Sequence, residues 1–73
     1  MSNRFSVQKF GENVRALRKS KGYSQEGFAH HVDLDRTYIG GIERGERNPG
    51  LKVILRLADA LDVDASQLFS TDT

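Results

Sequence analysis

The chain has 73 residues, contains no cysteine and carries a formal net charge of +1. This length suits one domain with a small core, and the lack of cysteine excludes both disulfide bonds and thiolate metal sites. No apolar stretch approaches the roughly 20 residues that a membrane helix requires. We therefore expect a single cytoplasmic domain over residues 1–73, with its core at about 7–69 and no membrane contact.

Charge is distributed unevenly along the chain. Residues 1–21 have a net charge of +5 and residues 36–52 one of +2, whereas residues 22–35 and 53–73 each have −3. A molecule with this distribution can turn a basic face toward a polyanion and hold its acidic end away. Ordinary surface charge is the alternative explanation until the motifs are considered.

The first predicted helix runs from Val7 to Lys21. Its apolar residues recur at helical spacing, with basic residues largely on the other side, and Gly22 ends the pattern. Such a helix should bury one face and leave the other in solvent.

Two short helices joined by a very short turn are expected next. Ser24 can cap the first of them, and Asp35 can cap the second, which should bury Ile39 and Ile42 before Gly45 terminates it. The inward residues of the first are Phe28, Ala29 and Val32.

A fourth helix is expected after a break over residues 48–50, and Asp64 with Gln67 has the spacing of a capping box for a short fifth helix. No alternating β-branched run or hairpin turn indicates a strand. The predicted fold is therefore all-α, a compact bundle of five helices. The inward stripe of the fourth helix comprises Leu51, Ile54, Leu57, Ala58 and Leu61.

Four motifs stand out along these helices: Ser24-Gln25-Glu26 with Phe28-Ala29, then Ile42-Glu43, Arg47-Asn48-Pro49 and the run 57–63. Together they resemble the Cro/repressor-type (XRE) helix-turn-helix family, from about residue 10 to residue 69. The strings 34–39 and 41–44 are also similar to the controller proteins of restriction–modification systems. The resemblance implies a lambda-repressor-like DNA-binding domain that binds operator DNA as a homodimer and regulates transcription.

The third helix opens with three side chains that can reach base edges, Arg36, Thr37 and Tyr38. Arg36 can donate two hydrogen bonds to O6 and N7 of guanine, so it is the predicted specificity residue. An ion pair with Asp33 or Asp35 is the alternative for Arg36. A partly packed aromatic ring is the alternative for Tyr38.

Contacts with the DNA backbone are predicted for further residues, which would position the protein without reading sequence. Gln25 matches the family's glutamine at the start of the second helix, where the amide and the helix dipole both favour a phosphate. Surface charge is the alternative for the basic residues. The predicted set is Gln25, Arg44, Arg47, Asn48 and Lys52.

Two further pairs of residues bear on the third helix. By the same resemblance, Arg18 and Glu43 align with a structural ion pair of the family. Gly40 and Gly41 lie inside the third helix, where each glycine costs about 1 kcal/mol relative to alanine. Close approach of the helix to DNA and tight packing between helices are two explanations for that cost.

Apolar residues beside the inward stripe of the fourth helix, and at the end of the fifth, predict a self-complementary dimer surface. Single exposed apolar side chains need no partner, but the resemblance implies dimerisation through the last helices. Two recognition helices about 34 Å apart would fit one turn of B-DNA and a palindromic operator. The predicted surface comprises Val53, Leu55, Leu68 and Phe69.

The sequence thus predicts a DNA-binding transcriptional regulator, most similar to the controller of a restriction–modification operon. RNA polymerase would be a further partner if the protein activates transcription. The alternatives are a phage-type repressor and an antitoxin-like module that acts mainly through a protein partner. His30 and His31 are adjacent and cannot share a metal as an i, i+4 pair could, and no nucleophile has a visible base. No enzymatic activity, metal, cofactor or small-molecule substrate is therefore expected.

Overall fold

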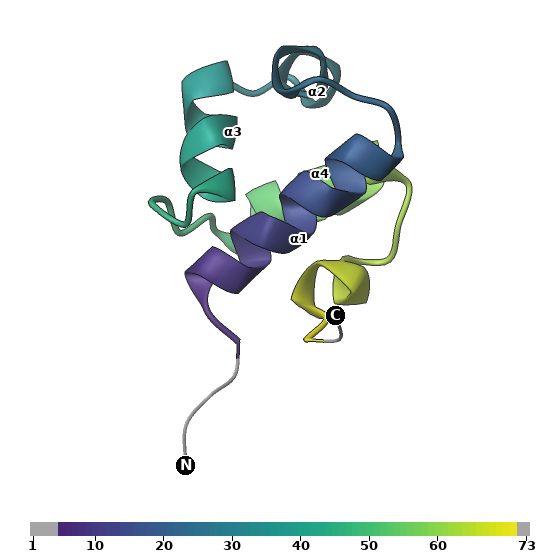
Figure 1. The fold of residues 1–73 in the computed structure, drawn as a ribbon. Helices are drawn as coiled ribbons and strands as arrows, with labels where there is room; N and C mark the ends of the chain where they lie inside the picture. Colours follow the sequence, from purple (N-terminus) through teal and green to yellow (C-terminus); the bar gives the residue numbers. More distant parts are fainter. Residues whose placement is uncertain (1–4, 72–73) are drawn as a thin grey trace.

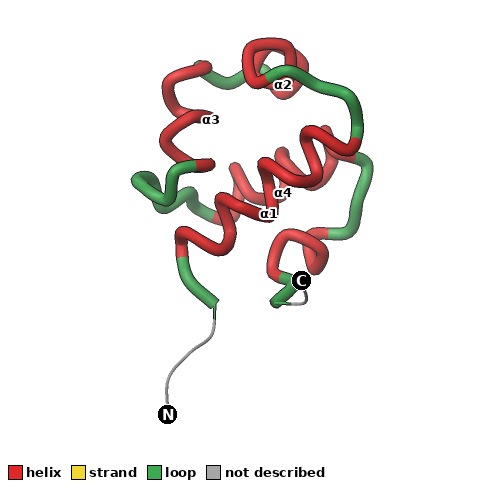
Figure 2. The backbone as a smooth tube through the Cα atoms, in the orientation of Figure 1, coloured by secondary structure: helices red, strands yellow, loops and turns green. Residues whose placement is uncertain are grey.

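Four α-helices and one short 3-10 helix form the fold of residues 5–71, the part of the chain that this computed structural model describes (Figure 1). The elements are α1 (Val7–Ser20), α2 (Gln25–Val32), α3 (Arg36–Glu43), α4 (Leu51–Leu61) and η1 (Ala65–Phe69). No strand occurs in this range, as Figure 2 shows. The all-α prediction is confirmed, whereas the predicted fifth α-helix is wrong, because η1 is a 3-10 helix.

The last element has five residues, and its hydrogen bonding is that of a 3-10 helix, a form that is typical of short segments. The Gln67 N–H donates to the Asp64 carbonyl, which is the i to i+3 bond of a 3-10 turn. The Asn13 side-chain amide of α1 donates to the carbonyls of Leu68 and Ser70, each at 2.9 Å. The Asp64 side chain makes no capping hydrogen bond, so the predicted capping box is wrong.

The start of α2 and the start of α3 are both fixed by side-chain caps. The Ser24 hydroxyl accepts from the Gly27 N–H at 2.9 Å, and the Asp35 carboxylate accepts from the Thr37 N–H at 2.7 Å. Both predicted N-caps are confirmed. Between them the chain turns through Asp33, whose φ of 61° is a left-handed conformation that aspartate tolerates. The turn is therefore as short as predicted.

Buried apolar side chains from all five elements form one core. The helices α1 and α3 approach each other closely at Gly11, where an added Cβ would overlap the Ile42 carbonyl oxygen and lie 2.8 Å from that of Glu43. Glycine is required there because both neighbours are backbone atoms. The core comprises Phe10, Val14, Phe28, Ala29, Val32, Ile39, Ile42, Leu57, Ala58, Leu61 and Leu68.

Two apolar residues lie differently from the predictions. Leu51 is 69% exposed and does not belong to the inward stripe, because α4 enters the core with its second half, where Leu57 and Leu61 are buried. Leu68 is completely buried and does not belong to a dimer surface, because η1 packs against α1 and α4. A second copy of the chain could not reach Leu68 in this fold.

The arrangement of the helices leaves α3 at the edge of the molecule. Figure 1 shows α1 crossing the centre, with α3 on one side of it and η1 on the other. The start of α3 is exposed at Arg36 and Thr37, while its inner face packs on α1 and α2. No helix within residues 5–71 has the length and apolar character needed to cross a membrane.

Candidate nucleic-acid interface

The exposed first turn of α3 carries the three predicted base-contacting residues. Arg36 and Thr37 are exposed, and Tyr38 is half-buried against the core. Among the ion pairs of residues 5–71, none includes Arg36. The Asp35 carboxylate caps α3 instead, by accepting from the Thr37 N–H. The guanidinium of Arg36 is thus available to an external acceptor, and Tyr38 has a packing role whatever else it contacts.

Arg18 and Glu43 form a buried ion pair between α1 and the end of α3. Arg18 donates from Nε to Glu43 Oε2 at 2.7 Å and from Nη2 to Oε1 at 3.0 Å, and its Nη1 donates to the Tyr23 carbonyl at 2.9 Å. The two side chains are 7% and 3% exposed. A carboxylate at the end of α3 would repel a polyanion, and the two-pronged contact with Arg18 neutralises it.

Gln25 connects α2 to the same buried pair. Its Nε2 donates to Glu43 Oε1 at 3.2 Å, which holds the side chain at the junction of α2 and α3. An amide nitrogen has two hydrogens, so Gln25 can make this bond and still donate to an anion at the N-terminus of α2. The position is therefore compatible with the predicted phosphate contact.

Arg44 and Arg47 are exposed residues just beyond α3, and their side chains fold back over it. Arg44 Nε lies 3.1 Å from Glu46 Oε2, in an ion pair that is open to solvent. This hydrogen bond and the charge of Arg44 lower the pKa of the Glu46 carboxyl. The pairing of Arg44 with Glu46 was not predicted, because the two residues lie in a loop where spacing does not indicate which side chains meet.

The glycines of α3 are covered by the side chains of Arg44 and Arg47 and, from the start of α2, by that of Gln25. A Cβ at Gly40 would lie 2.9 Å from Arg44 Nη1 and 3.5 Å from Gln25 Oε1. A Cβ at Gly41 would lie 2.7 Å from Arg47 Cγ. Three of the predicted backbone-contacting residues thus come together over two adjacent glycines.

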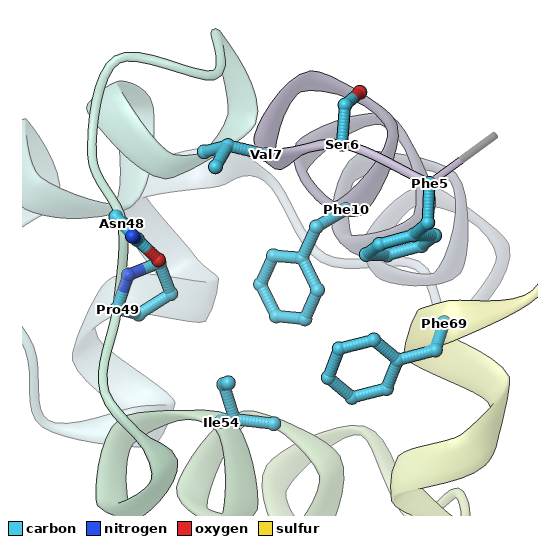
Figure 3. A pocket seen from close by; sticks show the side chains of 8 residues that line it. All are labelled: Phe5, Ser6, Val7, Phe10, Asn48, Pro49, Ile54 and Phe69. Carbon is cyan, nitrogen blue, oxygen red and sulfur yellow. The ribbon is translucent and has the colours of Figure 1, made fainter. Parts of the chain in front are cut away.

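The other two predicted backbone-contacting residues lie apart from that group. Asn48 is exposed in the loop before α4 and lines the pocket in Figure 3. Lys52 is exposed in the first turn of α4.

The predicted dimer residues differ in how much of each side chain is exposed. Leu55 is 51% exposed and Phe69 is 43% exposed, whereas Val53 is half-buried. The Phe69 ring lies 5.4 Å from that of Phe10 and closes one side of a pocket of about 300 Å³ (Figure 3). Of the predicted dimer residues, Leu55 and Phe69 are the most accessible, and Leu68 is excluded by its burial.

Residues 5–71 contain no group of three or more histidine, aspartate or glutamate side chains that could hold a metal ion. His31 is exposed, with its ring stacked on Tyr23 at 4.9 Å and its Nε2 at 3.2 Å from the Ala60 carbonyl. Through these contacts His31 connects α2 to Tyr23 and to α4, which spacing alone did not indicate.

Comparison with known proteins gives consistent matches over most of the chain. The family model described as helix-turn-helix, HTH_3, matches residues 14–68. The control protein C.MunI of a Mycoplasma species is 44% identical over 63 residues, which cover 85% of this chain and 85% of that protein. The structure of the restriction-modification controller protein C.AhdI from Aeromonas hydrophila matches with a TM-score of 0.83 and 52% identity, covering 86% of this chain and 96% of that one. The controller protein C.Esp1396I, solved as a tetramer in complex with its natural 35 base-pair operator, matches with a TM-score of 0.78 and 34% identity, covering 93% and 87%.

Proposed function

The chain belongs to the helix-turn-helix family HTH_3, and from this membership we propose that it is a transcriptional regulator that binds operator DNA through the major groove. One observation carries the proposal: the first turn of α3 projects Arg36 and Thr37 into solvent, and none of the ion pairs within residues 5–71 engages Arg36. A helix fits the major groove, and arginine donates two hydrogen bonds to guanine there.

The two groups of polar residues have different tasks in this proposal. Arg36, Thr37 and Tyr38 contact base edges and give specificity. The second group contacts phosphates and fixes the orientation of α3. Because these contacts are electrostatic, the affinity for DNA falls as the salt concentration is raised. It comprises Gln25, Arg44, Arg47, Asn48 and Lys52.

We propose further that two copies bind together through the exposed apolar side chains of α4 and η1. Leu55 and Phe69 are the main contacts and Val53 borders them, since Leu68 lies in the core. A chain of 73 residues has a small core and gains stability from such association. The tetramer of C.Esp1396I on its operator supports an oligomeric mode of binding. A twofold pair would read a palindromic operator with half-sites about 34 Å apart.

The control proteins among the relatives favour a role in a restriction–modification operon. In this role the protein is a single cytoplasmic domain without enzymatic activity, and RNA polymerase is its partner where it activates. A phage-type repressor is the second candidate, supported by 32% identity over 63 residues to the immunity repressor of Bacillus phage phi105, although these residues cover only 44% of that protein.

Selection of duplexes from a random pool, followed by gel shifts with the selected and a scrambled duplex, tests this function. Arg36→Ala should abolish discrimination between the duplexes while leaving salt-sensitive binding, and Arg47→Ala should weaken binding to both alike. Equal losses on both duplexes for Arg36→Ala would remove its base-reading role. Failure to enrich any duplex would contradict the function.

A further inference from the structure

Two adjacent glycines in the middle of an eight-residue helix require an explanation. Gly40 and Gly41 are both buried, yet glycine is the poorest helix former after proline. At Gly11 the explanation is backbone packing, because the nearest atoms are carbonyls of α3. At Gly40 and at Gly41 the three nearest atoms outside the helix backbone all belong to side chains. Close packing on the backbone of another helix therefore does not account for the pair, although the Gln25 side chain at the start of α2 reaches Gly40.

The side chains over the pair are those assigned to phosphate contact. Above Gly40, the Arg44 guanidinium and the Gln25 amide approach the same point, at 2.9 and 3.5 Å. Above Gly41, the neighbours are Cγ, Nε and Cδ of Arg47, at 2.7, 3.4 and 3.6 Å. The aliphatic part of Arg47 thus lies against α3, in the space that any larger residue would fill.

We propose that Gly40 and Gly41 are positioning residues, which allow Arg44 and Arg47 to lie against α3 with their guanidinium groups held for phosphate contact. This inference rests on the proposed function, because it concerns how the predicted phosphate-binding residues are presented. A side chain already held against the protein loses less conformational freedom when it binds, so it contributes more to affinity.

The two positions differ in how much a methyl group should disturb them. At Gly40 the close atom is Nη1 of Arg44, the far end of a flexible side chain, which can move aside at little cost. At Gly41 the close atom is Cγ of Arg47, so the whole side chain beyond it must be redirected. Gly41→Ala should therefore weaken DNA binding more than Gly40→Ala.

Gly41→Ala separates positioning from stability. Alanine is the better helix former, so the variant should unfold at a urea concentration equal to or higher than that of the wild type. Its affinity for the selected duplex and for the scrambled duplex should fall by the same factor. That factor should be no larger than the loss of affinity in Arg47→Ala. Its salt slope should fall by about one, as expected when a phosphate contact is lost.

A double-mutant cycle identifies the partner of Gly41. In an Arg47→Ala background, Gly41→Ala should cause no further loss of affinity. In an Arg36→Ala background, the matched control, it should cause the same fold loss as in the wild type. An equal loss in all three backgrounds would show that the glycine serves close approach to DNA instead, and no loss in any background would also overturn the positioning role.

A measurement without DNA distinguishes failure of this inference from failure of the proposed function. Nuclear Overhauser contacts between the Gly41 α-protons and the Arg47 side-chain methylenes should be present in the free protein and lost in Gly41→Ala. Their absence from the wild type would overturn the inference while leaving DNA binding intact. Absence of salt-sensitive DNA binding by the wild type would refute the proposed function and the positioning role with it.

Discussion

Replacing Arg18 with methionine should remove a large part of the stability of this domain. The substitution keeps the aliphatic length but leaves the Glu43 carboxylate, which is 3% exposed, with the Gln25 amide as its one remaining side-chain donor among residues 5–71. Breaking a buried pair by removing one partner costs about 3–5 kcal/mol. A domain of 73 residues has a total free energy of unfolding of about 4–11 kcal/mol. Arg18→Met should therefore lose between about a quarter and all of this free energy of unfolding.

Urea unfolding followed by circular dichroism at the helical band measures this loss. With a slope near 1 kcal/mol per molar for a small domain, the midpoint should fall by about 3 M or more. The double variant Arg18→Met/Glu43→Leu should recover most of the stability, because no unpaired charge then remains buried. Glu46→Gln is the matched control, since it breaks the exposed pair with Arg44 and should leave the midpoint unchanged. A loss below about 1 kcal/mol for Arg18→Met, or a double variant as unstable as the single one, would refute the reasoning.

Three further predictions concern the core, the dimer surface and the loop after α3. Leu68→Ala should lower the free energy of unfolding in urea by about 2–5 kcal/mol, because it leaves a cavity in the core. Leu55→Ser should instead reduce self-association, measured by sedimentation, without loss of monomer stability. The reverse pattern would place Leu68 in the interface. Gly11→Ala should lower the free energy of unfolding by more than about 1 kcal/mol, although alanine is the better helix former, because the methyl group has no space between α1 and α3. A variant more stable than the wild type would contradict this close packing. Because Arg44 lowers the pKa of Glu46, their contact persists at neutral pH and is lost only as the pH falls through that lowered value. Glu46→Gln should therefore tighten binding to all duplexes a few-fold at neutral pH in gel shifts, and weaker binding would contradict competition between Glu46 and phosphate.

The sequence predicts local features of this molecule well, because they depend on residues close together in the chain. Ser24 and Asp35 cap their helices by contacting backbone two or three positions away, so residue type and spacing are sufficient to indicate them. The apolar faces of α1, α2 and α3 follow the helical period for the same reason.

Features that depend on how far the core extends are harder to predict from the sequence. Leu51 has the right period for the inward stripe, but periodicity does not indicate that the core stops short of the first turn of α4. Leu68 and Phe69 are neighbours of similar character, and only the packing of η1 decides that the first is buried and the second exposed. Gly11 gives no signal of its own, because its close contact is with backbone more than thirty positions away.

The bonds from Asn13 to the carbonyls of Leu68 and Ser70 join positions 55 and 57 apart in sequence. A nascent chain cannot make them until residues up to Ser70 have left the ribosome. Fragments that end before Leu68 because translation was interrupted cannot make these two bonds. They also lack the completely buried side chain of Leu68 in the core. Such fragments should be degraded by cellular proteases rather than accumulate as defective competitors of the intact protein.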